Sequence, residues 1–269
     1  MPRARRIERT ILALAFAAAA GYVFTHRTVD PVTTRVAVAE VTLGGDSARS
    51  VEQVVYVQDV TRLGDIVLSA GRPVDEPVED VLARAWRLVD EVWPDSMRSD
   101  LVQVSVVEGE RRGLVGVVHR SATRSGWILS VDAADFDEPD LMRATIVHEL
   151  AHVVTLGPDV FTFGPGGCSG FEMPLGCAGP GSVLARFGRR FWPEGAATVT
   201  GESAFVNSYA ASAVHEDLAE TFTAWVFDWT IEPGTVAEAK VGLLADDAEM
   251  TAVREQLRSR MLERWSRTA

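Results

Sequence analysis

Ile146-Val147-His148-Glu149-Leu150-Ala151-His152-Val153-Val154 is the stretch that decides the fold, and it has the pattern H-E-x-x-H within an apolar run. On an α-helix, residues four apart lie on one face, so His148 and His152 can direct two imidazole nitrogens at one zinc ion. Glu149 lies one step around the helix, where its carboxylate can accept a proton from a water molecule beside that ion. The stretch therefore predicts a buried helix that holds zinc.

The residues on both sides define the ends of this helix. Asp137-Glu138-Pro139-Asp140 supplies a cap, a proline suited to the first turn and negative charge at the N-terminus. Gly157-Pro158 ends the helix. Apolar and small residues line much of its remaining surface, which predicts that the helix is buried: Leu141, Ala144, Thr145, Val147, Leu150 and Val154.

The composition describes an acidic protein with enough apolar residues for a substantial core. The chain has 269 residues, of which 47% are hydrophobic, and a net charge of −12. Residues 1–27 hold five arginines and one glutamate, which leaves −16 for the remainder and argues against nucleic acid as a partner. Lys240 is the only lysine beside 25 arginines, a ratio that we attribute to coding bias without a bearing on mechanism.

The N-terminal segment 1–27 has the pattern of an export signal. Four arginines lie between positions 3 and 9, and the apolar run Ile11–Phe24 follows, with Ala18-Ala19-Ala20 as a cleavage site. A run of 14 residues is short for a membrane span and suits a signal peptide. The alternative is a retained anchor that attaches the protein to the membrane through residues 11–24. In both cases we expect the body of the protein to be secreted or otherwise extracytoplasmic.

We divide the rest of the chain into an extension, 28–75, and a domain, 76–269. The extension is rich in strands, with apolar and β-branched runs at Val36–Leu43 and Val51–Val60. The domain begins with an amphipathic helix over Val78–Trp93. Three strands follow that helix and precede the H-E-x-x-H helix: Leu101–Glu108, Gly113–Arg120 and Trp127–Val131.

Beyond the H-E-x-x-H helix the chain is irregular over 157–182 and then helical. The irregular segment holds Cys168 and Cys177, which predict one disulfide in an exported chain. Helices are predicted over Val183–Trp192, capped by Ser182, and over Val214–Asp228 and Asp247–Ser266. The expected fold is α+β and zincin-like by analogy: a small mixed sheet with the active-site helix above a mainly helical lower subdomain.

The third ligand of a catalytic zinc ion has to come from outside the H-E-x-x-H helix. Such an ion usually takes three protein ligands and leaves the fourth position to water. The metzincin pattern places a glycine and then a histidine where this chain has Thr155 and Pro158, so that class is excluded. His215 is the only later histidine.

Glutamates are better candidates for this ligand than His215. Glu216 and Glu220 are four apart on one helical face, so one can bind zinc while the other accepts the N–H of a liganding histidine. Asp217 is rotated away from that face. Glu194, in a W-P-E-G turn, is the rival, because W-x-E-G also follows H-E-x-x-H in some other zinc peptidases. We favour Glu216, since acidic residues directed inward on an otherwise apolar helix need a reason.

The stretch 208–222, SYAASAVHEDLAETF, resembles the active-site helix region of the anthrax lethal factor catalytic domain and related gluzincins, in which a tyrosine precedes an E-x-x-A-E-x-F motif. It is also similar to exported bacterial zinc metallopeptidases with a cysteine loop and an F-W pair. The resemblance covers residues 140–230. It implies that Glu216 is the third ligand, that Glu220 supports a histidine, and that Tyr209 donates its hydroxyl to the transition state. Lethal factor's substrate-docking domains have no counterpart here, so its substrate does not carry over.

These residues lead us to expect zinc-dependent hydrolysis of a peptide or protein by a monomer. Glu149 acts as the general base and passes the proton to the leaving nitrogen, while zinc and Tyr209 share the charge of the oxyanion. The strand Gly113–Arg120 could pair with an extended substrate if it is an edge. His119 could line the same groove, although a lone strand histidine is more often a surface residue.

A zinc-containing binding protein of the cell envelope, without turnover, is the alternative. Glu149 argues against it, because a structural zinc ion has no use for a general base and is usually closed by four protein ligands. A sensor or assembly factor at the membrane is supported by the anchor segment alone.

Overall fold

The computed structural model of the chain describes residues 34–35, 59–109, 116–121, 124–164, 167–193 and 202–268. Within these residues the architecture is α+β, which confirms the predicted class. The predicted export segment and the strand Val36–Leu43 lie outside the described residues, as does most of Val51–Val60. No helix in the part that the structure describes is long and apolar enough to cross a membrane.

The larger sheet is mixed, with the strand order β1-β2-β4-β6-β5 and with β3 paired to β2. β4 and β6 are parallel, whereas β2 pairs with β4, and β5 with β6, in the antiparallel sense. The order leaves β5 at one edge. The strands are β1 (Thr34–Arg35), β2 (Asp59–Ser69), β3 (Arg72–Pro73), β4 (Leu101–Glu108), β5 (Gly116–Arg120) and β6 (Trp127–Asp132).

β2 extends well beyond the strand predicted to end at Val60. Ile66 and Leu68 are buried while Val67 between them is exposed, which is the alternation of a strand with one face on a core. Gly64 follows an irregularity in the register with β4, and this break hides the alternation in the sequence. Because β2 pairs with β4, this part of the N-terminal extension belongs to the same sheet as the predicted domain.

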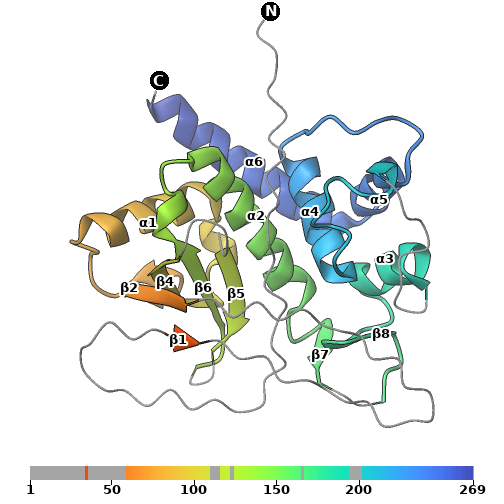
Figure 1. Cartoon of the computed structure of the whole chain (residues 1–269), viewed down its shortest axis with the longest axis horizontal. Coiled ribbons are helices and arrows are strands. Elements are labelled where there is room, and N and C mark those ends of the chain that lie inside the picture. Colours follow the sequence, from red (N-terminus) through yellow and green to blue (C-terminus); the bar gives the residue numbers. More distant parts are fainter. Residues whose placement is uncertain are drawn as a thin grey trace, which may run out of the picture.

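Helices cover the sheet and then continue away from it (Figure 1). α1 packs on β2 and β4, and α2 lies against β5, while α3, α4 and α5 lie on the other side of α2. α6 returns to α1. The helices are α1 (Asp80–Val92), α2 (Pro139–Thr155), α3 (Val183–Phe191), α4 (Val214–Val226), α5 (Val236–Ala245) and α6 (Ala248–Thr268).

α2 is buried because it lies between the sheet and the helical part of the molecule. It begins at Pro139 and carries Asp140 in its first turn, as predicted, but the N-cap residue Glu138 makes no side-chain capping hydrogen bond, so that detail of the prediction is wrong. The Leu156 amide donates to the His152 carbonyl at the other end. Over residues 146–153 buried side chains occupy every side of α2, so this part of the helix is covered all round, whereas its first two residues are exposed.

α5 was not predicted from the sequence. Thr235 is its N-cap, and the Thr235 hydroxyl accepts a hydrogen bond from the Glu238 amide at 3.2 Å. The Glu238 side chain accepts in turn from the Gly234 amide at 2.7 Å. This T-x-x-E pattern is a variant of the capping box and was the available signal for a helix start.

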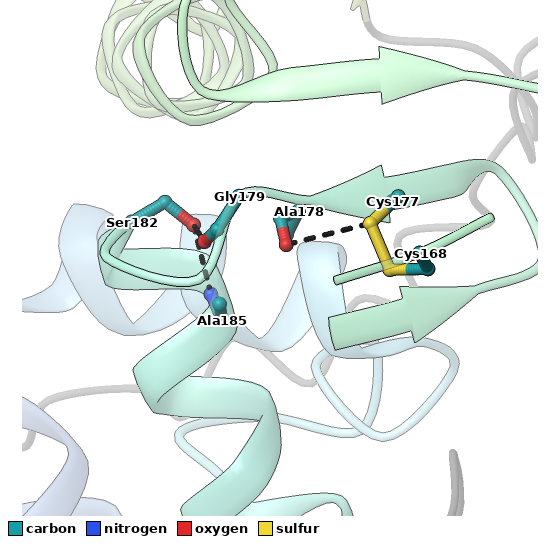
Figure 2. The surroundings of a disulfide bond; sticks show 6 residues. All are labelled: Cys168, Cys177, Ala178, Gly179, Ser182 and Ala185. Atoms are coloured by element: carbon teal, nitrogen blue, oxygen red, sulfur yellow. Dashed lines mark hydrogen bonds between the residues drawn. A yellow bond between two sulfur atoms is a disulfide. The ribbon is translucent and has the colours of Figure 1, made fainter. Parts of the chain in front are cut away.

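The segment predicted as irregular contains a small second sheet with the order β7-β9-β8. Its strands, β7 (Phe161–Phe163), β8 (Phe171–Met173) and β9 (Gly176–Ala178), have three residues each, too few for a period to be recognised. The predicted disulfide Cys168–Cys177 is confirmed and joins the segment before β8 to β9 (Figure 2). Ser182 caps α3 as predicted, accepting from the Ala185 amide at 3.1 Å.

Candidate metal centre

Two imidazole rings one turn apart on α2 form the first part of the site. His148 and His152 are buried, and their Nε2 atoms lie 2.9 Å apart. The i, i+4 spacing on a helix produces this pairing, as the sequence predicted. Val147 and Leu150 of the same helix are fully buried in the core, so the helix cannot rotate to expose the rings without exposing apolar surface.

Glu216, in the first turn of α4, brings a carboxylate to the same point. Its Oε2 atom lies 3.0 Å from His148 Nε2 and 3.2 Å from His152 Nε2. α4 packs directly against α2, so the packing of two helices that are distant in sequence makes the three side chains converge. The rival candidate Glu194 lies outside the described residues.

These three side chains, the metal cluster, form a donor set that could hold a metal ion. In a tetrahedral site with bonds of about 2.0–2.1 Å, ligand atoms lie about 3.3 Å from one another. The separations here are 2.9, 3.0 and 3.2 Å. Within the described residues, His148, His152 and Glu216 form the group of potential ligands that could hold a metal ion. Two imidazoles and one carboxylate are the three protein ligands in one known class of catalytic zinc site.

The three groups differ in charge in the protein without metal. Burial lowers the pKa of His152 to about 4, although Glu216 acts in the opposite direction. Burial acts likewise on His148, but Glu220 and Glu216 outweigh it and raise the pKa of that ring well above its ordinary value. Burial also disfavours the charge of Glu216, yet the adjacent histidines hold its pKa well below the ordinary value. His148 therefore carries the proton that a metal ion has to displace.

Glu220 supports His148 from one turn farther along α4. Its Oε1 atom lies 2.7 Å from His148 Nδ1, close enough to form an ion pair with the ring and leave Nε2 directed at the metal cluster. This is the place that the sequence predicted for Glu220. Asn207 donates a hydrogen bond to the other oxygen, Oε2, and sequence reasoning missed this residue. The available signal was compositional, because Asn207 is the only asparagine in the chain.

Glu149 is buried beside the metal cluster and contacts the edge strand. Its Oε2 atom accepts a hydrogen bond from the Val118 amide of β5 at 2.8 Å. Burial raises the pKa of Glu149 to about 7, against the opposing effects of His148 and of the Val118 amide. β5 can approach α2 this closely because residue 116 is glycine, where a Cβ would lie 2.6 Å from Thr145 Cγ2.

Tyr209 lies in the turn before α4 and contacts both His148 and Glu216. Its ring centroid is 5.8 Å from that of His148, and Glu216 lies close enough to act on the pKa of its hydroxyl. Burial and the charge of Glu216 raise the pKa of the hydroxyl, so it keeps its proton. The structure thus places Tyr209 with the residues named in the sequence analysis.

The two remaining described histidines lie in different environments. His215 is buried, with Nε2 at 3.2 Å from Glu216 Oε1 and its ring centroid 5.6 Å from that of His152. It therefore borders the metal cluster on the side of the second Glu216 oxygen. His119 is exposed on β5, opposite Ile128 of β6.

Asp217, Lys240 and Trp192 form a second buried polar group, the lysine cluster, on another side of α4. Asp217 Oδ2 lies 2.6 Å from Lys240 Nζ and accepts from Trp192 Nε1 at 2.7 Å. Lys240 Nζ also donates to the Ala204 carbonyl at 2.7 Å and lies 4.0 Å from the ring centroid of Phe205. No role was predicted for Lys240 from the sequence, whereas in the structure it is the cation of this cluster.

Comparisons with family models, with curated proteins and with solved structures found no match for this chain.

Proposed function

We propose that this chain is a zinc-dependent endopeptidase of the gluzincin kind, with a zincin fold, that acts on peptides or proteins outside the cytoplasm. The observation that carries the proposal is the convergence of two imidazole nitrogens and the Glu216 carboxylate, with Glu149 buried beside them. The mixed sheet beside α2 and the helical part that supplies Glu216 support the zincin fold by analogy. The disulfide and segment 1–27 support the location.

The residues divide the chemistry among them. His148, His152 and Glu216 would hold the zinc ion, which when bound supplies a Lewis acid and lowers the pKa of water towards about 7. Glu149 accepts the proton of the attacking water and delivers it to the leaving nitrogen. Burial raises its pKa to about 7 in the metal-free protein, and the positive charge of a bound zinc ion would act in the opposite direction. Tyr209 keeps its hydroxyl proton and donates a hydrogen bond to the carbonyl oxygen as negative charge develops there.

β5 provides a surface for an extended substrate. It ends the strand order of the larger sheet, and its Val118 amide is directed at Glu149 instead of at β6. A peptide that adds to this edge through main-chain groups of β5 other than the Val118 amide would lie alongside the general base. This arrangement supports cleavage within a chain, because an edge strand accepts a segment without requiring a terminus.

The substitution Glu149→Gln tests the proposal. We expect the purified variant to retain one zinc ion per chain by metal analysis and to lose peptidase activity on a peptide library by about 10²–10⁴-fold. Glu172→Gln on β8 is the matched control, because Glu172 is an exposed glutamate, and this variant should cleave like the wild type.

Three outcomes would contradict the proposal. Wild-type protein without zinc would remove the metal centre, and hydrolysis retained by Glu149→Gln would remove the mechanism. Wild-type protein that holds zinc and cleaves no peptide, with or without a chelator, would support the non-catalytic zinc protein of the cell envelope instead.

A further inference from the structure

Asn207 connects the turn that carries Tyr209 to the carboxylate that supports the metal cluster. Its Oδ1 atom accepts a hydrogen bond from the Ala210 amide at 2.9 Å, while its Nδ2 atom donates to Glu220 Oε2. The other oxygen of the same carboxylate, Glu220 Oε1, lies 2.7 Å from His148 Nδ1. One side chain therefore joins the 207–210 turn to a candidate zinc ligand through Glu220.

We infer that Asn207 is a positioning residue of the metal centre, which orients Glu220 and, through it, the His148 ring, so that zinc affinity depends on a residue in the tyrosine turn. The inference rests on the proposed function. It goes beyond that function because it assigns the orientation of His148 to a side chain that does not touch the metal cluster.

The chemistry of the two partners requires an amide at this position. An ionised Glu220 can only accept hydrogen bonds, and the Ala210 N–H can only donate one. Asparagine supplies the donor and the acceptor from one planar group. Aspartate could still accept from Ala210 but would place a second carboxylate against Glu220, and alanine would lose both bonds.

The composition of the chain agrees with a specific requirement for asparagine. Asn207 is its only asparagine in 269 residues, so this residue type is not used for ordinary turns elsewhere in the sequence. A cap of the Ala210 amide alone would accept aspartate or serine, both of which form such turns. The donor directed at Glu220 is what distinguishes asparagine from these residues.

The experiment exchanges the donor and the acceptor between the two side chains. Zinc affinity is measured by competition with a chromogenic chelator for the wild type, Asn207→Asp, Glu220→Gln and the double variant, over a range of pH so that competition from the proton on His148 is separated from the loss of orientation. In Asn207→Asp two carboxylates face each other, and in Glu220→Gln two amide groups compete for the same hydrogen-bonding position. In the double variant the new amide at position 220 can donate to the new carboxylate at position 207, while the carbonyl of that amide accepts from His148.

We expect each single variant to bind zinc about tenfold more weakly, which is the lower end of the effect of residues that orient metal ligands. The double variant should recover, binding zinc at least as tightly as either single variant. Ser208→Ala, at the exposed neighbour, should match the wild type. Thermal unfolding of the metal-free proteins verifies that all variants are folded.

Losses that multiply in the double variant, to about a hundredfold, would show that Asn207 and Glu220 act independently and would overturn the inference. An unchanged affinity in Asn207→Asp would also overturn it. Both results leave the peptidase proposal standing, since zinc is still bound. Conversely, the expected pattern in a protein that cleaves no peptide would support the inference and remove the peptidase. Wild-type protein that takes up no zinc would remove both.

Discussion

Glu216 and Asp217 are consecutive carboxylates in the first turn of α4, both buried, and they face opposite environments. Glu216 meets imidazole nitrogens, and the adjacent histidines hold its pKa well below the ordinary value although burial opposes them. Asp217 meets an ammonium group and an indole N–H. Burial raises the pKa of Asp217 to about 6, with Lys240 acting in the opposite direction.

The two environments differ in the kind of cation they offer. Lys240 is a permanent part of the chain, and it joins α5 to α4 and to the Ala204 carbonyl, while Trp192 joins the end of α3. Imidazoles can be neutral, and in that form they bind metal ions reversibly. The lysine cluster should therefore determine the stability of the fold, and the metal cluster should determine zinc affinity.

The largest effect is expected when the cation of the lysine cluster is removed. Lys240→Met leaves Asp217 buried without its ammonium partner, and breaking a buried pair in this way costs about 3–5 kcal/mol of unfolding free energy. Urea unfolding of the metal-free wild type and variant measures this loss of unfolding free energy. The double variant with Asp217→Asn should lose less than the two single losses combined, because the uncompensated charge is then absent.

Arg72→Met is the control for this loss. Arg72 and Asp95 are an exposed pair at 3.5 Å, with 78% and 50% of the side chains accessible, so the cost should be at most about 1 kcal/mol. A loss of that size in Lys240→Met as well would mean that the lysine cluster does not hold the helices together.

The adjacent carboxylates should separate zinc affinity from stability. Glu216→Gln removes a charged ligand and should weaken zinc binding by more than about a hundredfold. A hundredfold is about the upper end of the loss of affinity seen when residues that hydrogen bond to metal ligands are replaced. Asp217→Asn should change zinc affinity by less than about threefold while lowering the unfolding free energy. Chelator competition and urea unfolding on both variants provide the two measurements. Equal losses of affinity would show that the two sides of α4 are not distinct.

Reduction of the disulfide should affect the stability of the part of the fold that contains the lysine cluster, and not zinc affinity. Cys168–Cys177 closes a loop with a sequence separation of 9, and β9 leads into α3, whose end carries Trp192. Loss of the cross-link should lower the unfolding free energy by about 2–3 kcal/mol. Zinc affinity should remain within about threefold of the oxidised protein. The pair Cys168→Ser/Cys177→Ser gives the same comparison without a reductant, and a large loss of zinc affinity in it would contradict this division.

The sequence could predict those parts of the site that depend on local geometry. His148 and His152 are one turn apart on a helix, and their convergence needs no knowledge of the fold. Glu216 could be favoured because inward acidic residues on an apolar helix need partners, but its contact with the histidines depends on how α4 packs on α2. Asn207 and Lys240 have partners 13 and 23 or more residues away, and no local pattern indicates such partners.

The fold shows the same limit. Strands β4 and β6 and the helices with a clear apolar face were predicted closely from their periodicity, whereas β2 was obscured by the irregularity at Gly64. The strands β7, β8 and β9 are too short for any period. α5 has a capping box but an apolar surface without a clear polar face, so the signal at its start had no support from the residues that follow.

The smallest effect expected is the dependence of zinc affinity on pH. Burial lowers the pKa of His148, but Glu220 and Glu216 outweigh it. In the metal-free protein this ring therefore keeps its second proton and its positive charge at neutral pH. Zinc has to displace that proton, and lower pH therefore weakens binding by about tenfold per pH unit for one proton. Calorimetry in two buffers of different ionisation enthalpy counts the protons released.

Two variants assign the proton to His148. Glu220→Gln removes the charge that raises the pKa of His148 most, so it should release fewer protons and show a shallower dependence on pH. Glu149→Gln removes any contribution from Glu149, whose own pKa is about 7, and should keep the proton of His148. If Glu149→Gln abolished the release and Glu220→Gln left it unchanged, the proton would belong to the general base. The metal cluster would then bind zinc without competition from a proton on its own ligands. The contrast between the zinc ion at Glu216 and Lys240 at Asp217 would then depend only on the measured zinc affinities.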